Sequence, residues 1–223
     1  MSPLFAAGEF YYHARVTFFA WLAAIVLFLQ LPIPLYWFVV HPLSGFWRRR
    51  QRMGLIVGLL LSWPPVTACI IVFRRELFST ARPAVWRIAA GVALIAFEVW
   101  LFGKLTRDLG AARLIGKTEV SGGGSIARHG VYAHIRHPRY VGSFLAIVGA
   151  SLIAARPALW VVAAVWTVLM LTAIGLEERE MRVRFGAEFE AYAREVPRFI
   201  PAWRPRGERP GASAATTRRQ RDK

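Results

Sequence analysis

Two short polar clusters in this chain contain residue types that could bind a charged ligand. The first is RHGVYAHIRHPRYVG at 128–142, and the second is EERE at 177–180. Pro138 suits the first turn of a helix and biases His137 toward an extended conformation, so we expect His137 near a helix N-cap. Free backbone amides and the positive end of the helix dipole at that point, together with Arg136, would favour a carboxylate or a phosphate.

The composition indicates which elements must position these clusters. The chain has 223 residues, of which 56% are hydrophobic and only 19% are charged, which is too apolar for a soluble domain of this size. Most of the apolar surface is therefore expected to face lipid. The formal charge of +16 could by itself suggest a nucleic-acid partner. However, the basic residues fall between and after the apolar runs, where lipid headgroups would meet them, so no nucleic acid is expected.

Five apolar runs predict an all-α polytopic membrane protein with about five transmembrane helices. They cover residues 16–40, 53–73, 84–103, 140–155 and 157–176. The first two contain 25 and 21 residues without a formal charge, and roughly 20 residues suffice to cross a bilayer. The first run is also too long for the apolar region of a signal peptide, so we expect it to remain as a span.

A few residues inside these runs carry expectations of their own. Proline pairs at 32–34 and 64–65 should kink or unwind the first two spans, because proline lacks an amide donor. Glu98 either reaches the interface near Lys104 or faces a polar cavity inside the bundle, and the interface is slightly favoured. Cys69 is the only cysteine, which excludes an intramolecular disulfide, and we expect it to be a small buried hydrophobe.

The connection Arg156-Pro157 between the fourth and fifth runs leaves no room for another element. These two helices should be antiparallel neighbours, so their outer ends meet and bring both polar clusters to the same membrane surface. With five spans and the N-terminus outside, the inner segments hold 23 Lys and Arg residues and the outer segments five. The positive-inside rule then places the clusters and the C-terminus on the cytoplasmic side.

We divide the chain into three parts. Residues 1–103 hold three N-terminal transmembrane helices, and residues 104–203 hold a cofactor-binding loop, the helical hairpin and an interfacial helix. Residues 204–223 form a basic tail that is expected to be disordered, because it is rich in Arg, Gly, Pro, Ser and Thr. Within the second part, apolar residues at helical spacing over 177–196 predict one or two amphipathic helices along the inner interface, with a break at Gly186.

Each polar cluster also has a simpler interpretation. A basic cluster before a span is usually a topology anchor, and two glutamates after a span usually begin a solvated helix. The glycines at 122–124 lack the Lys-Ser/Thr that follows in a phosphate loop. No metal site is predicted, because the histidines do not form a convincing ligand set. The histidines considered are His13, His129, His134 and His137.

The order and spacing of these segments resemble the isoprenylcysteine carboxyl methyltransferase and phospholipid methyltransferase family of integral membrane enzymes. The resemblance covers roughly the last hundred residues before the tail. It runs through GVY at 130–132, IRHPRYVG at 135–142, EER at 177–179, FG at 185–186, Tyr192, and VPRFIP at 196–201.

The resemblance implies S-adenosylmethionine-dependent methyl transfer to a lipid or lipidated acceptor, isoprenylcysteine-like or phospholipid-like, at the cytosolic membrane face. In that family the cofactor is held at the cytosolic ends of the last helices without a Rossmann domain. The resemblance implies catalytic roles for Glu178 and for Arg198, which would orient an acidic substrate group. The implied cofactor-binding residues are Gly130, Tyr132, Arg136, His137, Pro138, Tyr140, Gly142, Glu177 and Glu178.

The sequence departs from the family pattern at two places. Val131 stands where the family usually has proline, and the segment SGGGS at 121–125 is an insertion. Both departures bear on substrate identity. Two alternatives are an NADPH-dependent membrane reductase resembling the sterol reductases, which have a similar arginine-histidine-proline pattern, and a non-catalytic membrane scaffold. The pair Glu177-Glu178 favours the methyltransferase. A bacterial inner membrane is the expected location, because no organelle signal is evident.

Overall fold

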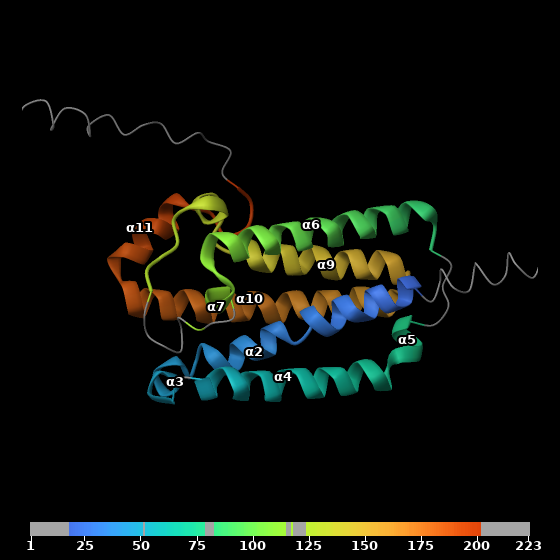
Figure 1. Cartoon of the computed structure of the whole chain (residues 1–223), viewed down its shortest axis with the longest axis horizontal. Helices are drawn as coiled ribbons and strands as arrows, with labels where there is room; N and C mark the ends of the chain where they lie inside the picture. Colours follow the sequence, from blue (N-terminus) through green and yellow to red (C-terminus); the bar gives the residue numbers. More distant parts are fainter. Residues whose placement is uncertain (1–17, 51, 79–82, 115–116, 118–123, 202–223) are drawn as a thin grey trace, which may run out of the picture.

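Regular structure in this chain is helical throughout the part that the computed structural model describes, which is residues 18–50, 52–78, 83–114, 117 and 124–201 (Figure 1). Four helices in these ranges are long and apolar enough to cross a membrane, and a shorter apolar helix accompanies them. The four are Phe18–Val40, Met53–Val72, Val85–Leu109 and Pro157–Phe185, and the shorter one is Pro138–Ala154. The predicted all-α polytopic class is confirmed. The tail at 204–223, His13 and the glycines at 122–123 lie outside the described residues.

The N-terminal part contains a helix over 18–30 followed by α2 (Ile33–Val40), α3 (Ser44–Arg50), α4 (Arg52–Val72) and α5 (Arg74–Phe78). A turn at 31–32 interrupts the first span beside Pro32, as predicted.

In contrast, α4 stays helical through Pro64 and Pro65, so of the expected kink or unwinding, the unwinding does not occur there. Each proline removes only its own amide, and the remaining backbone bonds carry the helix through. The expectation that Cys69 is buried is also wrong, because this side chain is exposed on α4. Figure 1 shows α4 at the edge of the bundle, where one side of the helix has no protein neighbour.

The C-terminal part contains α6 (Val85–Leu109), α7 (Ala111–Leu114), the short 3₁₀ helix η1 (Gly130–Ala133), α9 (Pro138–Ala154), α10 (Pro157–Phe185) and α11 (Ala187–Glu195). The predicted hairpin is confirmed, because only two residues separate the end of α9 at Ala154 from Pro157, and α9 packs against α10. Ala155 takes a left-handed conformation, with φ of 55°, in the tight turn. The break at Gly186 is confirmed as well, although α10 continues without interruption from Pro157 to Phe185.

Helices α6 and α9 cross with their backbones in contact, because glycines face one another at the crossing. A Cβ atom added at Gly91 would lie 2.6 Å from the carbonyl oxygen of Gly149. A Cβ atom added at Gly149 would lie 2.7 Å from the carbonyl oxygen of Gly91. Small residues at such positions allow membrane helices to approach closely. This crossing holds α9 against α6, and the N-terminal end of α9 carries part of the first polar cluster.

Glu98 on α6 lies inside the bundle, so the expectation that it reaches the interface is wrong. Its residue exposure is 7%. Arg139 Nη1 donates to Glu98 Oε1 at 3.0 Å, and Gln30 Nε2 donates to the same oxygen at 3.2 Å. A carboxylate within a membrane bundle is stabilised by such partners, which come here from the first span and from α9.

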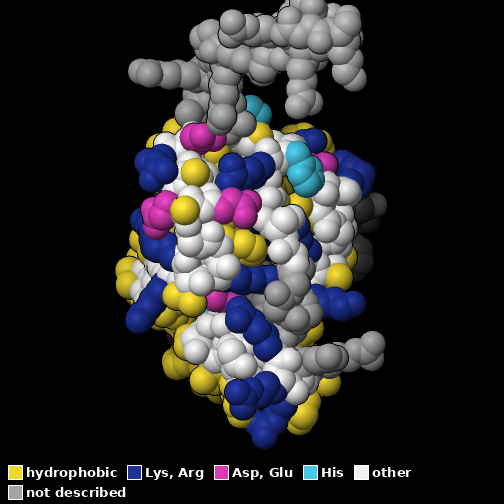
Figure 2. All heavy atoms as spheres, turned by 90° about the vertical axis from the view of Figure 1, so that its left-hand side faces the viewer, with side chains coloured by type: hydrophobic (Ala, Val, Ile, Leu, Met, Phe, Trp, Pro, Cys, Tyr) yellow, Lys and Arg dark blue, Asp and Glu magenta, His cyan; other side chains and the backbone are white. Residues whose placement is uncertain are grey.

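The helix ends gather in two groups (Figure 1). The helices α3, α7 and α11 lie at one end of the bundle, and α5 lies at the other. Figure 2 faces the first of these ends and shows Lys and Arg side chains scattered over it, with fewer acidic groups between them. Helix α3 contributes Arg48, Arg49 and Arg50 to this end. Arg48, Arg49 and Arg50 therefore lie at the same end of the bundle as α7 and α11.

Candidate functional site

Glu178 on α10 forms the centre of a buried ion cluster with side chains from the segment just before α9 and from the C-terminal segment. Its residue exposure is 1%. The Nε and Nη2 atoms of Arg136 donate to Glu178 Oε1 at 3.2 and 3.0 Å, and His137 Nε2 lies 3.1 Å from the same oxygen. Arg198 Nε donates to Oε1 at 3.0 Å and Arg198 Nη2 to Oε2 at 2.5 Å. The cluster joins the two polar segments that the hairpin topology brings together.

Backbone hydrogen bonds hold the segment before α9 against the segment after α11. The amide of Arg136 donates to the carbonyl of Pro197 at 2.8 Å, and the amide of His137 donates to the carbonyl of Arg198 at 3.1 Å. Arg136 Nη1 donates to the carbonyls of Ala193 and Val196, each at 2.6 Å. His137 is the N-cap of α9 and Pro138 its first residue, as the sequence predicts.

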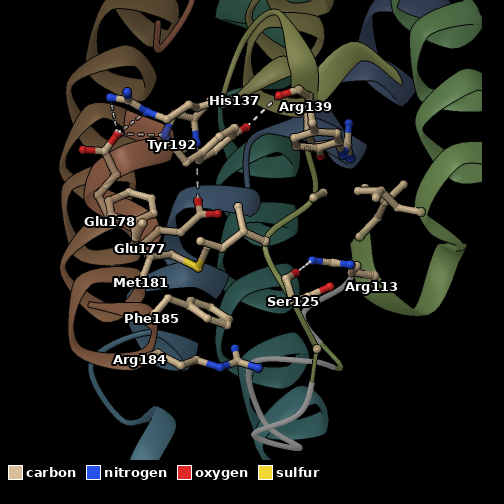
Figure 3. Close-up of a pocket in the computed structure, with 18 of the residues that line it drawn as sticks. Arg113, Ser125, His137, Arg139, Glu177, Glu178, Met181, Arg184, Phe185 and Tyr192 are labelled. Atoms are coloured by element: carbon tan, nitrogen blue, oxygen red, sulfur yellow. Dashed lines mark hydrogen bonds and ion pairs between the residues drawn. The ribbon is translucent and has the colours of Figure 1, made fainter. Parts of the chain in front are cut away.

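Glu177 lies beside Glu178 in the chain but faces a pocket. Tyr140 donates its hydroxyl to Glu177 Oε2 at 2.7 Å, and the ring of His137 stacks on that of Tyr140 with 5.6 Å between the centroids. The Glu177 side chain is 26% exposed. Figure 3 shows its carboxylate within the pocket, whereas the Glu178 carboxylate accepts hydrogen bonds from Arg136 and Arg198.

The pocket lies between α10, α11 and the segment 124–132, with Trp37 of α2 and the end of α6 completing its wall. Six of the residues implied by the family resemblance line it. They are Tyr132, Arg136, His137, Tyr140, Glu177 and Glu178. Burial and the nearby Glu177 carboxylate raise the pKa of the Tyr132 hydroxyl above its usual range, so this hydroxyl stays neutral.

The other four residues implied by the resemblance do not line the pocket but support it. Gly130 has φ of 57°, and a Cβ there would collide with the Asp108 carboxylate, so glycine is required. A Cβ at Gly142 would lie 3.3 Å from Glu98 Cγ, which places this residue against α6. Pro138 is buried in the first turn of α9. Arg198 has a side chain that is 50% exposed, and the hydrogen bonds that it donates to the Glu178 carboxylate raise its pKa.

Several residues of the pocket wall were not identified from the sequence. They include Trp37, Arg113, Ile126, Arg139, Met181, Arg184, Phe185 and Phe189. The apolar face formed by Met181, Phe185 and Phe189 was recognised as a helical pattern but assigned to the membrane interface, whereas these side chains border the pocket. The sequence around Trp37 did not indicate a site, because Trp37 lies on α2, far in the chain from the two polar clusters.

The pocket wall combines three kinds of group that suit a cationic, aromatic ligand. Glu177 supplies a carboxylate, Tyr132, Phe185 and Phe189 supply aromatic rings, and Arg113 and Arg184 supply cations. A carboxylate and aromatic faces stabilise a bound cation, and an arginine binds a ligand carboxylate. Among the described residues, no group of three or more His, Cys, Asp or Glu side chains is arranged to hold a metal ion.

Comparisons with known proteins bear on the same region. Residues 86–188 match the family model of phospholipid methyltransferases. A methanethiol S-methyltransferase of Crocosphaera subtropica is 40% identical over 70 residues, covering 31% of this chain and 27% of that protein. Methanethiol S-methyltransferase 1 of Bradyrhizobium diazoefficiens is 38% identical over 74 residues, covering 33% of this chain and 25% of that protein.

A third relative is the nickel-cobalt-cadmium resistance protein NccN of Alcaligenes xylosoxydans xylosoxydans, which is 31% identical over 137 residues, covering 54% of this chain and 64% of that protein. The chain thus spans about a quarter of the length of the two methanethiol S-methyltransferases and less than two thirds of NccN. No solved structure matches the chain. The predicted family resemblance is confirmed, because residues 86–188 are similar to the phospholipid methyltransferases and part of the chain is similar to two methanethiol S-methyltransferases.

Proposed function

We propose that this protein transfers a methyl group from S-adenosylmethionine to a lipid or lipidated acceptor at the cytosolic membrane face. The observation that carries the proposal is the Glu177 carboxylate, which Tyr140 holds within a pocket of aromatic and basic side chains at the basic end of the bundle. The family match over residues 86–188 supports the same activity.

The residues present fit S-adenosylmethionine. Glu177 and Tyr132 would face its positive charges, Phe185 and Phe189 its aromatic base, and Arg113 or Arg184 its carboxylate. When bound, the cofactor supplies an electrophilic methyl group on a sulfonium sulfur. The protein's task is then alignment and exclusion of water, because the displacement needs its two reacting atoms in line. The cluster around Glu178 fixes the pocket wall for this purpose.

An apolar cavity beside the pocket supports an apolar acceptor. It has a volume of about 310 Å³ and lies between α2 and α4. Trp37, Leu114 and Arg139 line both the cavity and the cofactor pocket, so the two spaces adjoin. A lipidic acceptor entering from the bilayer would place its reactive end at this junction. We propose a bacterial inner membrane with a cytoplasmic C-terminus as the setting.

The similarity to two methanethiol S-methyltransferases favours a second candidate acceptor, a small thiol. Both acceptors use the same cofactor pocket. A lipidic acceptor would fill the apolar cavity and a small thiol would not. A series of thiols of increasing chain length therefore distinguishes the two acceptors. Turnover that rises with chain length supports the lipidic acceptor, and turnover that is highest for methanethiol supports the small thiol.

The activity is tested by calorimetric titration of the detergent-purified protein with S-adenosylmethionine and, separately, with NADPH. We expect saturable binding of S-adenosylmethionine alone, and at least tenfold weaker binding in Glu177→Gln, which is roughly 1.4 kcal/mol. Val183→Ala, at an exposed residue of α10 that does not line the pocket, is the control. Binding of NADPH alone would favour a reductase, and binding of neither by folded protein would favour a scaffold.

A further inference from the structure

Arg139 occupies an unusual position between the two cavities. It lies one residue after Pro138 in the first turn of α9, and it lines both the cofactor pocket and the apolar cavity. Figure 3 shows Arg139 on the opposite side of the pocket from Glu178. A guanidinium at this junction would meet the reactive end of any acceptor that fills the apolar cavity.

The charge of Arg139 is unusual in the wall of the apolar cavity. Among its described lining residues, Arg139 alone is charged, and the others are aliphatic or aromatic. They are Ile33, Tyr36, Trp37, Leu55, Ile56, Leu59, Trp63 and Leu114. An arginine facing an apolar space loses solvation, which is compensated when a bound anion accepts its hydrogen bonds.

The contacts of Arg139 hold one side of its guanidinium and leave another side available. Arg139 Nη1 donates to Glu98 Oε1 at 3.0 Å and to Ser143 Oγ at 3.2 Å. The guanidinium carbon also lies 4.6 Å from the centroid of the Phe102 ring. Glu98 is not among the described residues that line the two cavities, so it contacts Arg139 from outside them. The Nε and Nη2 atoms can therefore donate to an acceptor.

We propose that Arg139 selects acceptors whose nucleophile is an anion, a thiolate or a carboxylate on an apolar body, over amines. This inference rests on the proposed methyltransferase function and specifies the acceptor class. A thiolate sulfur or a carboxylate oxygen keeps free lone pairs while it accepts a hydrogen bond from Arg139. An amine nitrogen has a single lone pair, which the reaction needs, and its protonated form is repelled by the guanidinium.

The chemistry balances without a protein base. A thiol or carboxylic acid first releases its proton to water, and the cation beside it favours this ionisation. The anion then forms a bond to the methyl carbon while the bond between that carbon and the sulfonium sulfur breaks, leaving its electron pair on sulfur. The products are a thioether or an ester and S-adenosylhomocysteine, so one negative and one positive charge are neutralised together.

The first test measures binding without cofactor and without turnover. Protein in lipid nanodiscs is titrated with hexanesulfonate and with hexylammonium, which share one chain and differ in charge. We expect saturable binding of hexanesulfonate, at least tenfold weaker in Arg139→Gln and in the double variant Arg139→Gln/Glu98→Gln. The double variant keeps the buried charges balanced and therefore guards against misfolding. Arg179→Gln, at an exposed arginine of the same end, should bind as the unchanged protein does.

The second test offers hexanethiol, hexanoate and hexylamine with labelled S-adenosylmethionine. We expect methylation of the thiol or of the carboxylate, whose products are a thioether or an ester and so distinguish the two nucleophiles, and none of the amine. In Arg139→Gln the KM for the anionic acceptor should rise at least tenfold.

Three results would overturn the proposal. They are preferential binding of hexylammonium, methylation of hexylamine at least as fast as of the other two acceptors, and an Arg139→Gln variant that loses affinity for S-adenosylmethionine but not for hexanesulfonate. Absence of S-adenosylmethionine binding in folded protein would instead refute the proposed function, while the sulfonate titration would still decide the role of Arg139.

Discussion

Glu177 and Glu178 are adjacent in the chain, but their carboxylates lie in different surroundings. Glu178 is 1% exposed and receives hydrogen bonds from Arg136 and Arg198, with His137 also in contact. Glu177 has a side chain that is 26% exposed, and it receives a hydrogen bond from Tyr140. The buried carboxylate positions other groups, whereas the exposed one is available to a ligand. At the scale of single residues, the two glutamates are therefore expected to have different roles.

These different surroundings predict that Glu178→Gln mainly lowers stability, whereas Glu177→Gln mainly weakens ligand binding. Glu178→Gln leaves the Arg136 guanidinium, with a side chain only 9% exposed, without its counter-ion. Breaking such a buried pair typically costs roughly 3–5 kcal/mol, so the melting temperature in detergent should fall markedly. Glu177→Gln should leave melting nearly unchanged and weaken S-adenosylmethionine binding. Equal melting temperatures for the two variants, measured by thermal unfolding, would contradict this assignment.

Single residues were predictable from the sequence where their neighbours are local. The position of His137 at the start of α9 follows from Pro138, which excludes His137 from the helix. The partners of Glu98 could not be predicted, because Gln30 lies 68 positions away and Arg139 lies 41 positions away in the chain. Their meeting depends on how the first span, α6 and α9 pack, and no local pattern encodes that packing.

At the scale of elements, the glycine contact between α6 and α9 controls the position of the site. Gly91→Ala would bring a Cβ to 2.6 Å from a backbone oxygen of α9, which cannot rotate away. Overpacking of this kind typically costs roughly 1–3 kcal/mol, so we expect a lower melting temperature and weaker S-adenosylmethionine binding.

Gly103→Ala is the matched control on the same helix. The nearest atom to its added Cβ is the mobile Arg107 Nη1, at 3.8 Å. This alanine should be neutral or slightly stabilising, because alanine favours helix over glycine by up to about 1 kcal/mol. Tolerance of Gly91→Ala to the same degree would show that α6 and α9 are not in backbone contact.

The elements themselves were largely predictable, because apolar runs and the Arg156-Pro157 connection constrain them strongly. The hairpin of α9 and α10 follows from that connection, and Gly186 ends α10 with φ of 51°, as its residue type indicates. The orientation of the amphipathic face was harder to infer. An apolar stripe at helical spacing can face lipid or a protein cavity equally well, and only tertiary structure shows that Met181 and Phe185 border the pocket.

At the scale of the whole molecule, an ion cluster at the basic end connects the N-terminal part to α10. His41 Nδ1 lies 2.7 Å from Glu180 Oε2, and Arg48 Nη2 donates to Glu180 Oε1 at 3.0 Å. Trp37 stacks on His41 with 4.7 Å between the ring centroids, and it also lines both cavities. The N-terminal part thus provides a wall of the site, although the sequence motifs lie entirely in the C-terminal part.

The orientation of the molecule can be tested by labelling single cysteines, because Cys69 is the only native one. In a Cys69→Ala background, Arg156→Cys marks the hairpin turn and Ala187→Cys marks the exposed start of α11, at the opposite end of α10. The 23 basic residues of the inner segments, against five in the outer ones, predict that Ala187 faces the cytoplasm. A membrane-impermeant maleimide should therefore label Arg156→Cys in intact bacterial spheroplasts, and Ala187→Cys only after lysis. The reverse pattern would place the pocket and its arginines on the outer surface, where S-adenosylmethionine made in the cytoplasm does not reach them, and would thereby refute the proposed function as well.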